Sequence, residues 1–192
     1  MRWILSAVAL AALLAPQEPA VQKPSAEATE GKPERFAAIL TAGPLTPGPT
    51  SIEIGIDRWG SNEMRAALYE VFRSGGQPSL LEAMKKLGVS GYLRMANHAR
   101  LQAAYAQQIV RDDGGRRIVL LAVRYTGDWE LNRDSGWTDY LFRMVTITLD
   151  GKGHGSGSLY HTAKVAFGQD GPELVSELSG QPTKIVSIQK VH

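Results

Sequence analysis

The chain of 192 residues contains no cysteine, and this absence excludes several classes of protein. Disulfides, thiol nucleophiles, iron–sulfur clusters and cysteine-ligated zinc all need that side chain. The lipid-modified cysteine of a bacterial lipoprotein is excluded for the same reason. A chain of this length can bury a sizeable core without cross-links, so folding does not require them.

An excess of charge of one sign is also missing. The chain has 21 basic and 19 acidic residues, for a formal net charge of +2. The two signs alternate along the sequence, and no basic block is interleaved with aromatic residues, as a nucleic-acid-binding face would need. We therefore expect no nucleic acid among the partners.

Only one apolar run is long. It extends from Trp3 to Ala15, is interrupted only by Ser6, follows Met1-Arg2 and ends at Pro16. Because it is shorter than the roughly 20 residues that span a bilayer, it is typical of a secretory signal peptide. We predict a signal peptide at residues 1–15, a mature N-terminus between residues 16 and 25, and an exported protein, periplasmic or secreted. An uncleaved N-terminal membrane anchor is the alternative, because the cleavage site is poorly defined: Ala20 at −1 would put Glu18 at −3, and Ala15 at −1 would put Leu13 at −3.

A polar segment follows the apolar run. Residues 16–33 are dominated by Pro, Glu, Ala, Lys and Gln and have no apolar period. Such a segment buries too little apolar surface to offset the entropy of ordering, so we expect a disordered linker. The folded part is predicted to be a single, mainly β domain over residues 34–192.

Most of this domain has the pattern of β-strands. Ile52, Ile54 and Ile56 alternate with polar residues, which predicts a half-buried strand. Residues 118–123 are apolar at every position, which predicts a strand covered on both faces. The sequence DDGG at residues 112–115 predicts a hairpin. The strands are expected at residues 35–41, 50–59, 91–96, 101–111, 116–125, 140–150, 154–167, 172–178 and 183–191.

One region changes to helical spacing. Ser61 can cap a helix over residues 62–74, Gly75-Gly76 can end it, and Pro78 can open a second helix over residues 79–87. The fold class that follows is α+β and mainly antiparallel β. We expect a barrel-like or strongly bent sheet of about eight or nine strands with a two-helix insertion. A two-sheet β-sandwich is the alternative.

Four short patterns together give the chain a resemblance. They are DRWGSNE at residues 57–63, Gly75-Gly76 before a Leu-Leu helix, GGRRIVL at residues 114–120, and Asp139-Tyr140 before a strand that ends in DGKGHGSG. With these patterns, residues 35–192 resemble a group of small exported bacterial proteins of unassigned function. The resemblance implies export and a single domain, and it carries no catalytic or binding residue.

The patterns that suggest catalysis fail on their spacing. In GHGSGS at residues 153–158, Ser156 has His154 and Ser158 two positions away, where a nucleophile elbow has glycines. Ser187 and Lys190 match S-x-x-K, but their surroundings alternate as a strand and not as a helix. The loop from Asp150 lacks the oxygen ligands of a calcium site. We therefore predict no catalytic residue, no metal and no cofactor.

The densest group of aromatic and polar residues lies between Gly127 and Tyr140. This group and the neighbouring end of the strand at residues 50–59 give the candidate binding residues Arg58, Trp59, Trp129, Arg133, Trp137 and Tyr140. Trp and Arg anchor many interfaces and sugar or peptide grooves, so the group can form a binding mouth. The other interpretation is that the Trp side chains close one end of the fold and belong to the core.

The functional expectation is a non-catalytic binding or interaction module of the cell envelope. Its partner would be an envelope protein or a small ligand. One alternative is a small-ligand or saccharide binder that uses the Trp and Arg mouth. The other alternative is a hydrolase with a carboxylate pair such as Glu130 and Asp139, which requires a separation of about 5–9.5 Å across a cleft.

Overall fold

The computed structural model describes residues 31–41, 43, 48–96, 98–124 and 139–191. The predicted signal peptide and nearly all of the predicted linker lie outside the described residues. The described elements are β1 (Glu34–Leu40), β2 (Thr50–Ile56), α1 (Asn62–Lys85), β3 (Gly91–Met95), β4 (Leu101–Ala103), β5 (Tyr105–Val110), β6 (Arg116–Val123), β7 (Phe142–Leu149), β8 (His154–Gly168), β9 (Gly171–Glu177) and β10 (Thr183–Val191).

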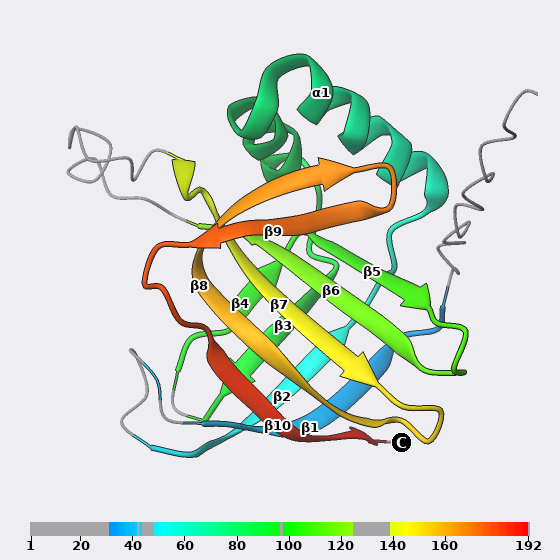
Figure 1. The fold of residues 1–192 in the computed structure, drawn as a ribbon, viewed down its shortest axis with the longest axis vertical. Coiled ribbons are helices and arrows are strands. Elements are labelled where there is room, and N and C mark those ends of the chain that lie inside the picture. The colour runs from blue at the N-terminus through cyan, green and yellow to red at the C-terminus, as the bar shows by residue number, and fades with distance from the viewer. Residues whose placement is uncertain (1–30, 42, 44–47, 97, 125–138, 192) are drawn as a thin grey trace, which may run out of the picture.

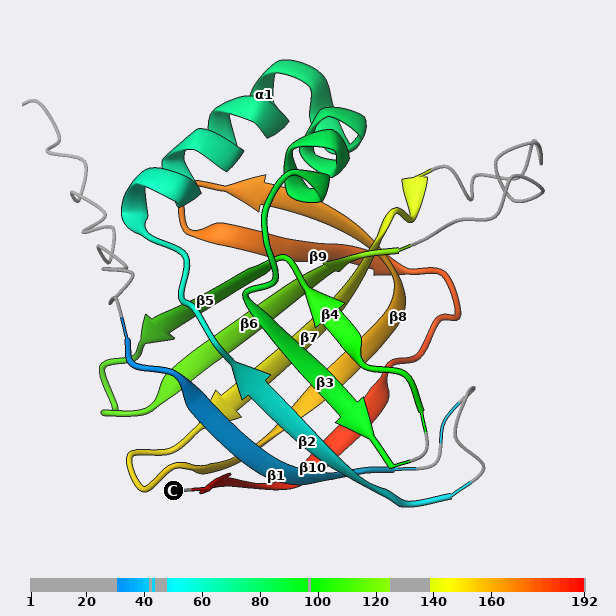
Figure 2. The same ribbon diagram turned by 180° about the vertical axis from the view of Figure 1, so that it is seen from behind.

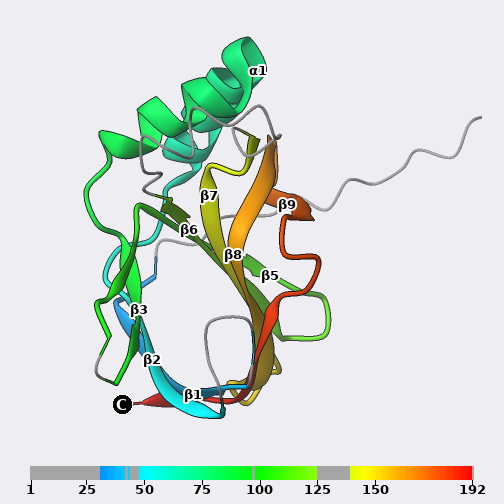
Figure 3. The same ribbon diagram turned by 90° about the vertical axis from the view of Figure 1, so that its left-hand side faces the viewer.

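All ten strands belong to one antiparallel sheet. Its order is β4-β3-β2-β1-β10-β8-β7-β6-β5, and β9 pairs with β8 beside this path. The prediction of an α+β, mainly antiparallel fold is confirmed. The strands form one sheet and not the two sheets of the alternative β-sandwich. The hydrogen-bonded path is open between β4 and β5, so the barrel-like prediction is not confirmed. Figure 3 shows that the sheet curls, with β1 to β3 on one side and β6 to β8 on the other.

The expected strand at residues 101–111 is divided in two, which is why ten strands replace eight or nine. Residues 101–103 pair with β3, and residues 105–110 pair with β6. Ala104 lies between them in a bend, and its amide still donates to Leu121 O at 3.0 Å. The two ends of the open path are therefore consecutive in the chain (Figure 2).

The inner face of the curled sheet carries one core. Ile52, Ile54 and Ile56 of β2 are all buried, which confirms the strand predicted from their alternation. They pack with inward side chains of β1, β6, β7 and β10. The start of β8 lies close to the end of β7, with which it pairs. A Cβ on Gly155 would lie 1.9 Å from Thr148 O, so this approach requires glycine.

A second core lies between the outer face and α1, which runs across the top of the molecule in Figure 1. Leu68, Leu80 and Met84 of α1 pack on Val119 and Leu121 of β6. Ile118 and Leu120 of the same strand belong to the inner core. The prediction that residues 118–123 are covered on both faces is therefore confirmed.

The helical region departs from the prediction of two helices. Ser61 caps α1 as expected, since its Oγ accepts from the Met64 amide at 3.2 Å. However, α1 is one element over residues 62–85 that bends at Gly76, the residue with a non-helical backbone. Gly76 has φ 63° and ψ −154°, a conformation open to glycine, so the chain changes direction there without a connecting loop.

Candidate functional site

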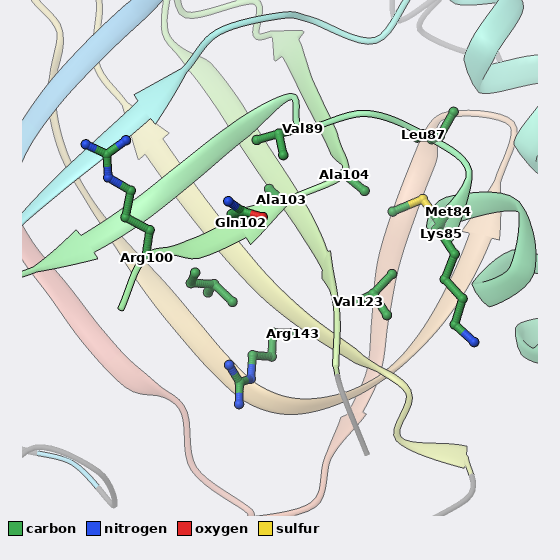
Figure 4. A pocket seen from close by; sticks show the side chains of 11 residues that line it. Met84, Lys85, Leu87, Val89, Arg100, Gln102, Ala103, Ala104, Val123 and Arg143 are labelled. Carbon is green, nitrogen blue, oxygen red and sulfur yellow. The ribbon is translucent and has the colours of Figure 1, made fainter. Parts of the chain in front are cut away.

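One cavity lies between the C-terminal end of α1 and the point where β4 continues into β5. It has a volume of about 290 Å³. Its walls come from α1, the segment before β3, β4, β6 and β7 (Figure 4). The lining residues are Met84, Lys85, Leu87, Val89, Arg100, Leu101, Gln102, Ala103, Ala104, Val123 and Arg143.

The cavity exists because one strand changes partner. The Ser90 amide donates to Ala103 O at 2.8 Å, whereas the Ala104 amide donates to Leu121 O at 3.0 Å. A strand that passes from one neighbour to another lets those neighbours separate. The side chains at the point of separation are Ala103 and Ala104, and these small groups leave the gap open.

Arg143 places a cation on the inner face at this gap. It lies on β7 in the register of Val145, Ile147 and Leu149, which belong to the inner core. Its neighbour across the ladder is Ala122, whose small side chain leaves room beside it. The side chain is partly buried, and its Nε has no exposed surface. A cation at a core-facing position is costly unless its surroundings compensate the charge, so this position is a functional candidate.

Arg100 supplies a second cation from the segment before β4. Its guanidinium lies 4.6 Å from the ring centroid of Tyr92, and the Arg35 guanidinium lies 5.4 Å from the same centroid. Tyr92 donates to the Glu53 carboxylate. That hydrogen bond, with the nearby charges of Arg94 and Arg100, holds the pKa of Glu53 below its usual value. Arg100 is therefore held over an aromatic face while its side chain stays exposed at the cavity.

A polar pair on β8 and β10 lies within the electrostatic influence of Arg143. His161 Nε2 is 3.0 Å from Thr183 Oγ1, and Thr183 is buried. Burial, and secondly the positive charge of Arg143, lower the pKa of His161. His161 therefore favours its neutral form, and the charge presented at this end of the sheet comes from arginine.

The opposite end of β6 carries a self-compensating network. Arg116 Nη2 and Nη1 donate to the two Glu34 carboxylate oxygens at 2.6 and 3.1 Å, and Nη1 also donates to Gln108 Oε1 at 2.8 Å. Lys190 Nζ donates to Glu34 Oε1 at 3.2 Å. Burial opposes ionisation of Glu34, but Arg116 and Lys190 outweigh it and lower its pKa. The charges of Glu34, Arg116 and Lys190 at this end therefore compensate one another.

The structure places the candidate residues predicted from the sequence in separate environments. Trp59 is 6% exposed, belongs to the inner core and donates through Nε1 to Lys32 O at 3.1 Å. Arg58 is exposed and donates to Gly88 O and Ser90 Oγ at 3.3 and 3.4 Å. Tyr140 lies beside β9, where its Oη accepts a hydrogen bond from Ser176 Oγ at 3.1 Å. The structure thus gives Trp59 a position in the core and not in a binding mouth.

Three of the candidates, Trp129, Arg133 and Trp137, lie outside the described residues, as does Glu130 of the hypothetical carboxylate pair. The other member, Asp139, forms an ion pair with Lys164 at 2.5 Å. The binding-mouth hypothesis for the segment 127–140 stays a prediction.

The short motifs have the local structures expected of them. Ser187 and Lys190 lie on β10 and not on a helical turn, and Ser187 has φ 53° at an irregularity of the strand. Asp150 Oδ1 accepts from the amides of Lys152 and His154, both at 2.9 Å, which closes the hairpin turn before β8. These groups are therefore engaged in turn and strand geometry.

Within the described ranges, no three His, Asp or Glu side chains are grouped as metal ligands. No helix in the described part of the chain has the length and apolar character needed to cross a membrane.

Comparison with known proteins adds no relative, because no family model, curated protein or solved structure matches this chain.

Arg100 and Arg143, which define the site, were not among the residues selected from the sequence. The sequence does contain a pattern that points to Arg143. Val145, Ile147 and Leu149 alternate as the buried face of a strand, and Arg143 occupies the next position of that face. Arg100 has no comparable signal. Its role depends on the bend at Ala104 and on the position of Tyr92, which are features of the tertiary structure.

Proposed function

We propose that this protein is a non-catalytic module that binds a small ligand in the cavity between α1 and the β4–β5 bend. The curled sheet, whose inner face is filled by the core, would serve as a rigid frame for the cavity at its edge. The observation that carries this proposal is the composition of the cavity wall: apolar side chains surround two arginines and one amide. Ligand sites typically combine a mostly apolar wall with a few polar groups that orient the ligand.

The size of the cavity supports a small ligand. Its volume of about 290 Å³ lies at the lower limit of the roughly 300–1,000 Å³ that is usual for ligand pockets. Met84, Leu87 and Val123 form its apolar wall, and Gln102 can donate and accept hydrogen bonds. This wall is suited to hold a ligand rather than to transfer protons, because arginine stays protonated.

A neutral fluorescent probe, N-phenyl-1-naphthylamine, tests the proposal. The wild-type protein should enhance its fluorescence, and Ala104→Leu, which fills the cavity, should weaken probe binding by at least about tenfold. Ala37→Leu adds the same atoms at an exposed position of β1 and should bind like the wild type. Circular dichroism should show that both variants remain folded. Equal binding by wild type and Ala104→Leu, or no binding by the wild type, would contradict the proposal.

We further propose that the ligand is bound after export, with residues 1–15 acting as a signal peptide. The support is the short apolar run between Arg2 and Pro16. Intact-mass analysis of the protein released from cells should give an N-terminus between residues 16 and 25. Recovery of only the full-length chain in the membrane fraction would instead support the anchor.

A further inference from the structure

The loop between α1 and β3 places an exposed apolar side chain next to exposed cations. Val89 of this loop is 48% exposed, and Leu87 is partly exposed. The Arg58 guanidinium lies against the same loop, because it donates to Gly88 O at 3.3 Å. A single exposed valine is ordinary, so the significance of Val89 depends on what surrounds it.

Exposed cations from three separate parts of the chain gather around this loop. They come from the C-terminal end of α1, from the residues after β2 and from the segment before β4. The cations are Arg58, Lys85, Lys86 and Arg100. Lys85, Val89 and Arg100 line one cavity, and Figure 4 shows Val89 between Arg100 and Leu87. We call the four cations together with Leu87 and Val89 the basic rim.

Carboxylates offset the charge of the basic rim only in part. Within the part of the chain that the structure describes, its ion pairs are limited to that of Lys85 with Glu82, at 2.7 Å. Arg100 helps to lower the pKa of Glu53, but Glu53 forms its ion pair with Arg94. The basic rim therefore presents an excess of positive charge beside an exposed apolar side chain.

The surface of an anionic membrane matches both of these properties. Each Lys or Arg that lies near anionic lipid head groups strengthens binding by about fivefold. An apolar side chain among such cations can enter the boundary between head groups and acyl chains. An acidic polypeptide would also attract the cations, but it offers no apolar layer to Val89.

From these observations we propose that the basic rim is a docking surface for a membrane that contains anionic phospholipids. Val89 and Leu87 would lie at the boundary of the acyl chains, and the cations would meet the lipid phosphates. This proposal goes beyond the binding of a ligand in the cavity and does not depend on it. In this orientation the mouth of the cavity faces the lipid, because Val89 and Arg100 belong to both.

A fluorophore attached at one position at a time tests the contact. Because the chain has no cysteine, Val89→Cys can be labelled specifically with nitrobenzoxadiazole. Val110→Cys is the matched control, since Val110 is 60% exposed and pairs with Arg116 at the other end of the sheet. Vesicles of phosphatidylglycerol and phosphatidylcholine should brighten the label at position 89 and shift its emission to the blue, and should leave the label at position 110 unchanged. The label reports its own surroundings, so an uncleaved N-terminal anchor would not by itself produce this difference.

Charge variants in the labelled Val89→Cys protein assign the effect to the cations. Lys86→Gln with Arg100→Gln should raise the amount of anionic lipid needed for half the fluorescence change by about 10- to 30-fold. Arg111→Gln with Lys152→Gln removes the same charge from exposed turns at the other end of the sheet and should change it by no more than about twofold. Added salt should weaken the response of the unmodified rim. Circular dichroism should show that all these proteins are folded.

Several outcomes would overturn the docking proposal. These are no response at position 89, equal responses at positions 89 and 110, and equal responses to anionic vesicles and to pure phosphatidylcholine. Equal lipid requirements for the two charge variants would also contradict it. A blue shift with soluble polyglutamate as large as that with vesicles would favour an acidic polypeptide as the partner instead.

The cavity-filling variant separates this proposal from the proposed function. In the labelled Val89→Cys protein, Ala104→Leu should respond to anionic vesicles as its parent does, although it binds the neutral probe weakly. If the parent responds to vesicles and the wild type does not bind the probe, the docking proposal stands and the cavity proposal is wrong. If folded Ala104→Leu loses the response to vesicles, docking depends on the cavity, and the proposal of an independent docking surface is wrong.

Discussion

Two arginines point inward from neighbouring strands of the same β-ladder, and their surroundings differ. Arg116 begins β6, and its guanidinium carbon lies 5.8 Å from the centroid of the Phe36 ring. Both carboxylate oxygens of Glu34 accept hydrogen bonds from it. Arg143 lies near the start of β7, opposite Ala122 at the far end of β6. It faces a cavity whose lining residues include no carboxylate. The same residue type thus belongs to a carboxylate network at one end of the sheet and lines a cavity at the other.

The neighbourhood of each arginine explains this difference. At the Arg116 end, Trp59 closes the inner core, and a Cβ on Gly31 would lie 2.4 Å from Trp59 Nε1 and 3.2 Å from Gln108 Nε2. At the Arg143 end, the nearby side chains Ala103, Ala104 and Ala122 are small. Large and paired groups therefore fill one end of the sheet, and small groups leave the other open.

The largest effect is expected at the closed end. Trp59→Ala should lower the free energy of unfolding by about 3–5 kcal/mol, because it removes a buried aromatic side chain. Arg58→Ala, at the adjacent exposed position, should change it by no more than about 0.5 kcal/mol. Urea unfolding at neutral pH measures both. A loss below about 1 kcal/mol for Trp59→Ala would mean that Trp59 does not close this end.

The two arginines should differ when each is replaced by methionine. Arg116→Met should cost about 2–3 kcal/mol, since it leaves Glu34, only 12% exposed in its side chain, with Lys190 alone. Arg143→Met should cost less than about 1 kcal/mol, because its side chain is only partly buried and methionine can keep the apolar contacts of the arginine stem. Chemical unfolding of both variants gives the comparison. Equal losses would show that Arg143 is as structural as Arg116.

The smallest effect is the pH dependence of the closed end. The pKa of Glu34 is lowered in the folded protein, so its stabilisation is present above the unfolded pKa and is lost as pH falls through the folded pKa. The free energy of unfolding of the wild type should therefore decrease more between pH 6 and pH 3 than that of Glu34→Gln. Urea unfolding at a series of pH values measures the two slopes. Identical slopes would exclude Glu34 as a source of acid sensitivity.

Much of the fold could be predicted because its signals are local. The alternation of Ile52, Ile54 and Ile56, the turn at residues 112–115 and the cap at Ser61 each involve residues close in sequence. The interruption of the helical region at Gly75-Gly76 lies where the sequence predicted it, although no separate connecting loop follows. The division of the strand at Ala104 was missed, because it depends on which strands pair with each half. Trp59 was selected as a candidate binding residue, but its side chain lies in the inner core.

The sequence by itself determined which face each strand presents and where helix and turns begin, since side-chain period and backbone propensity act over a few residues. It also placed Arg143 in an inward register. Only the tertiary structure decided that Arg116 meets Glu34 across 82 residues, and that Arg143 instead meets a cavity beside Arg100. That difference arises from strand pairing between distant segments, because the change of partner at Ala104 opens one end of the sheet while Trp59 closes the other.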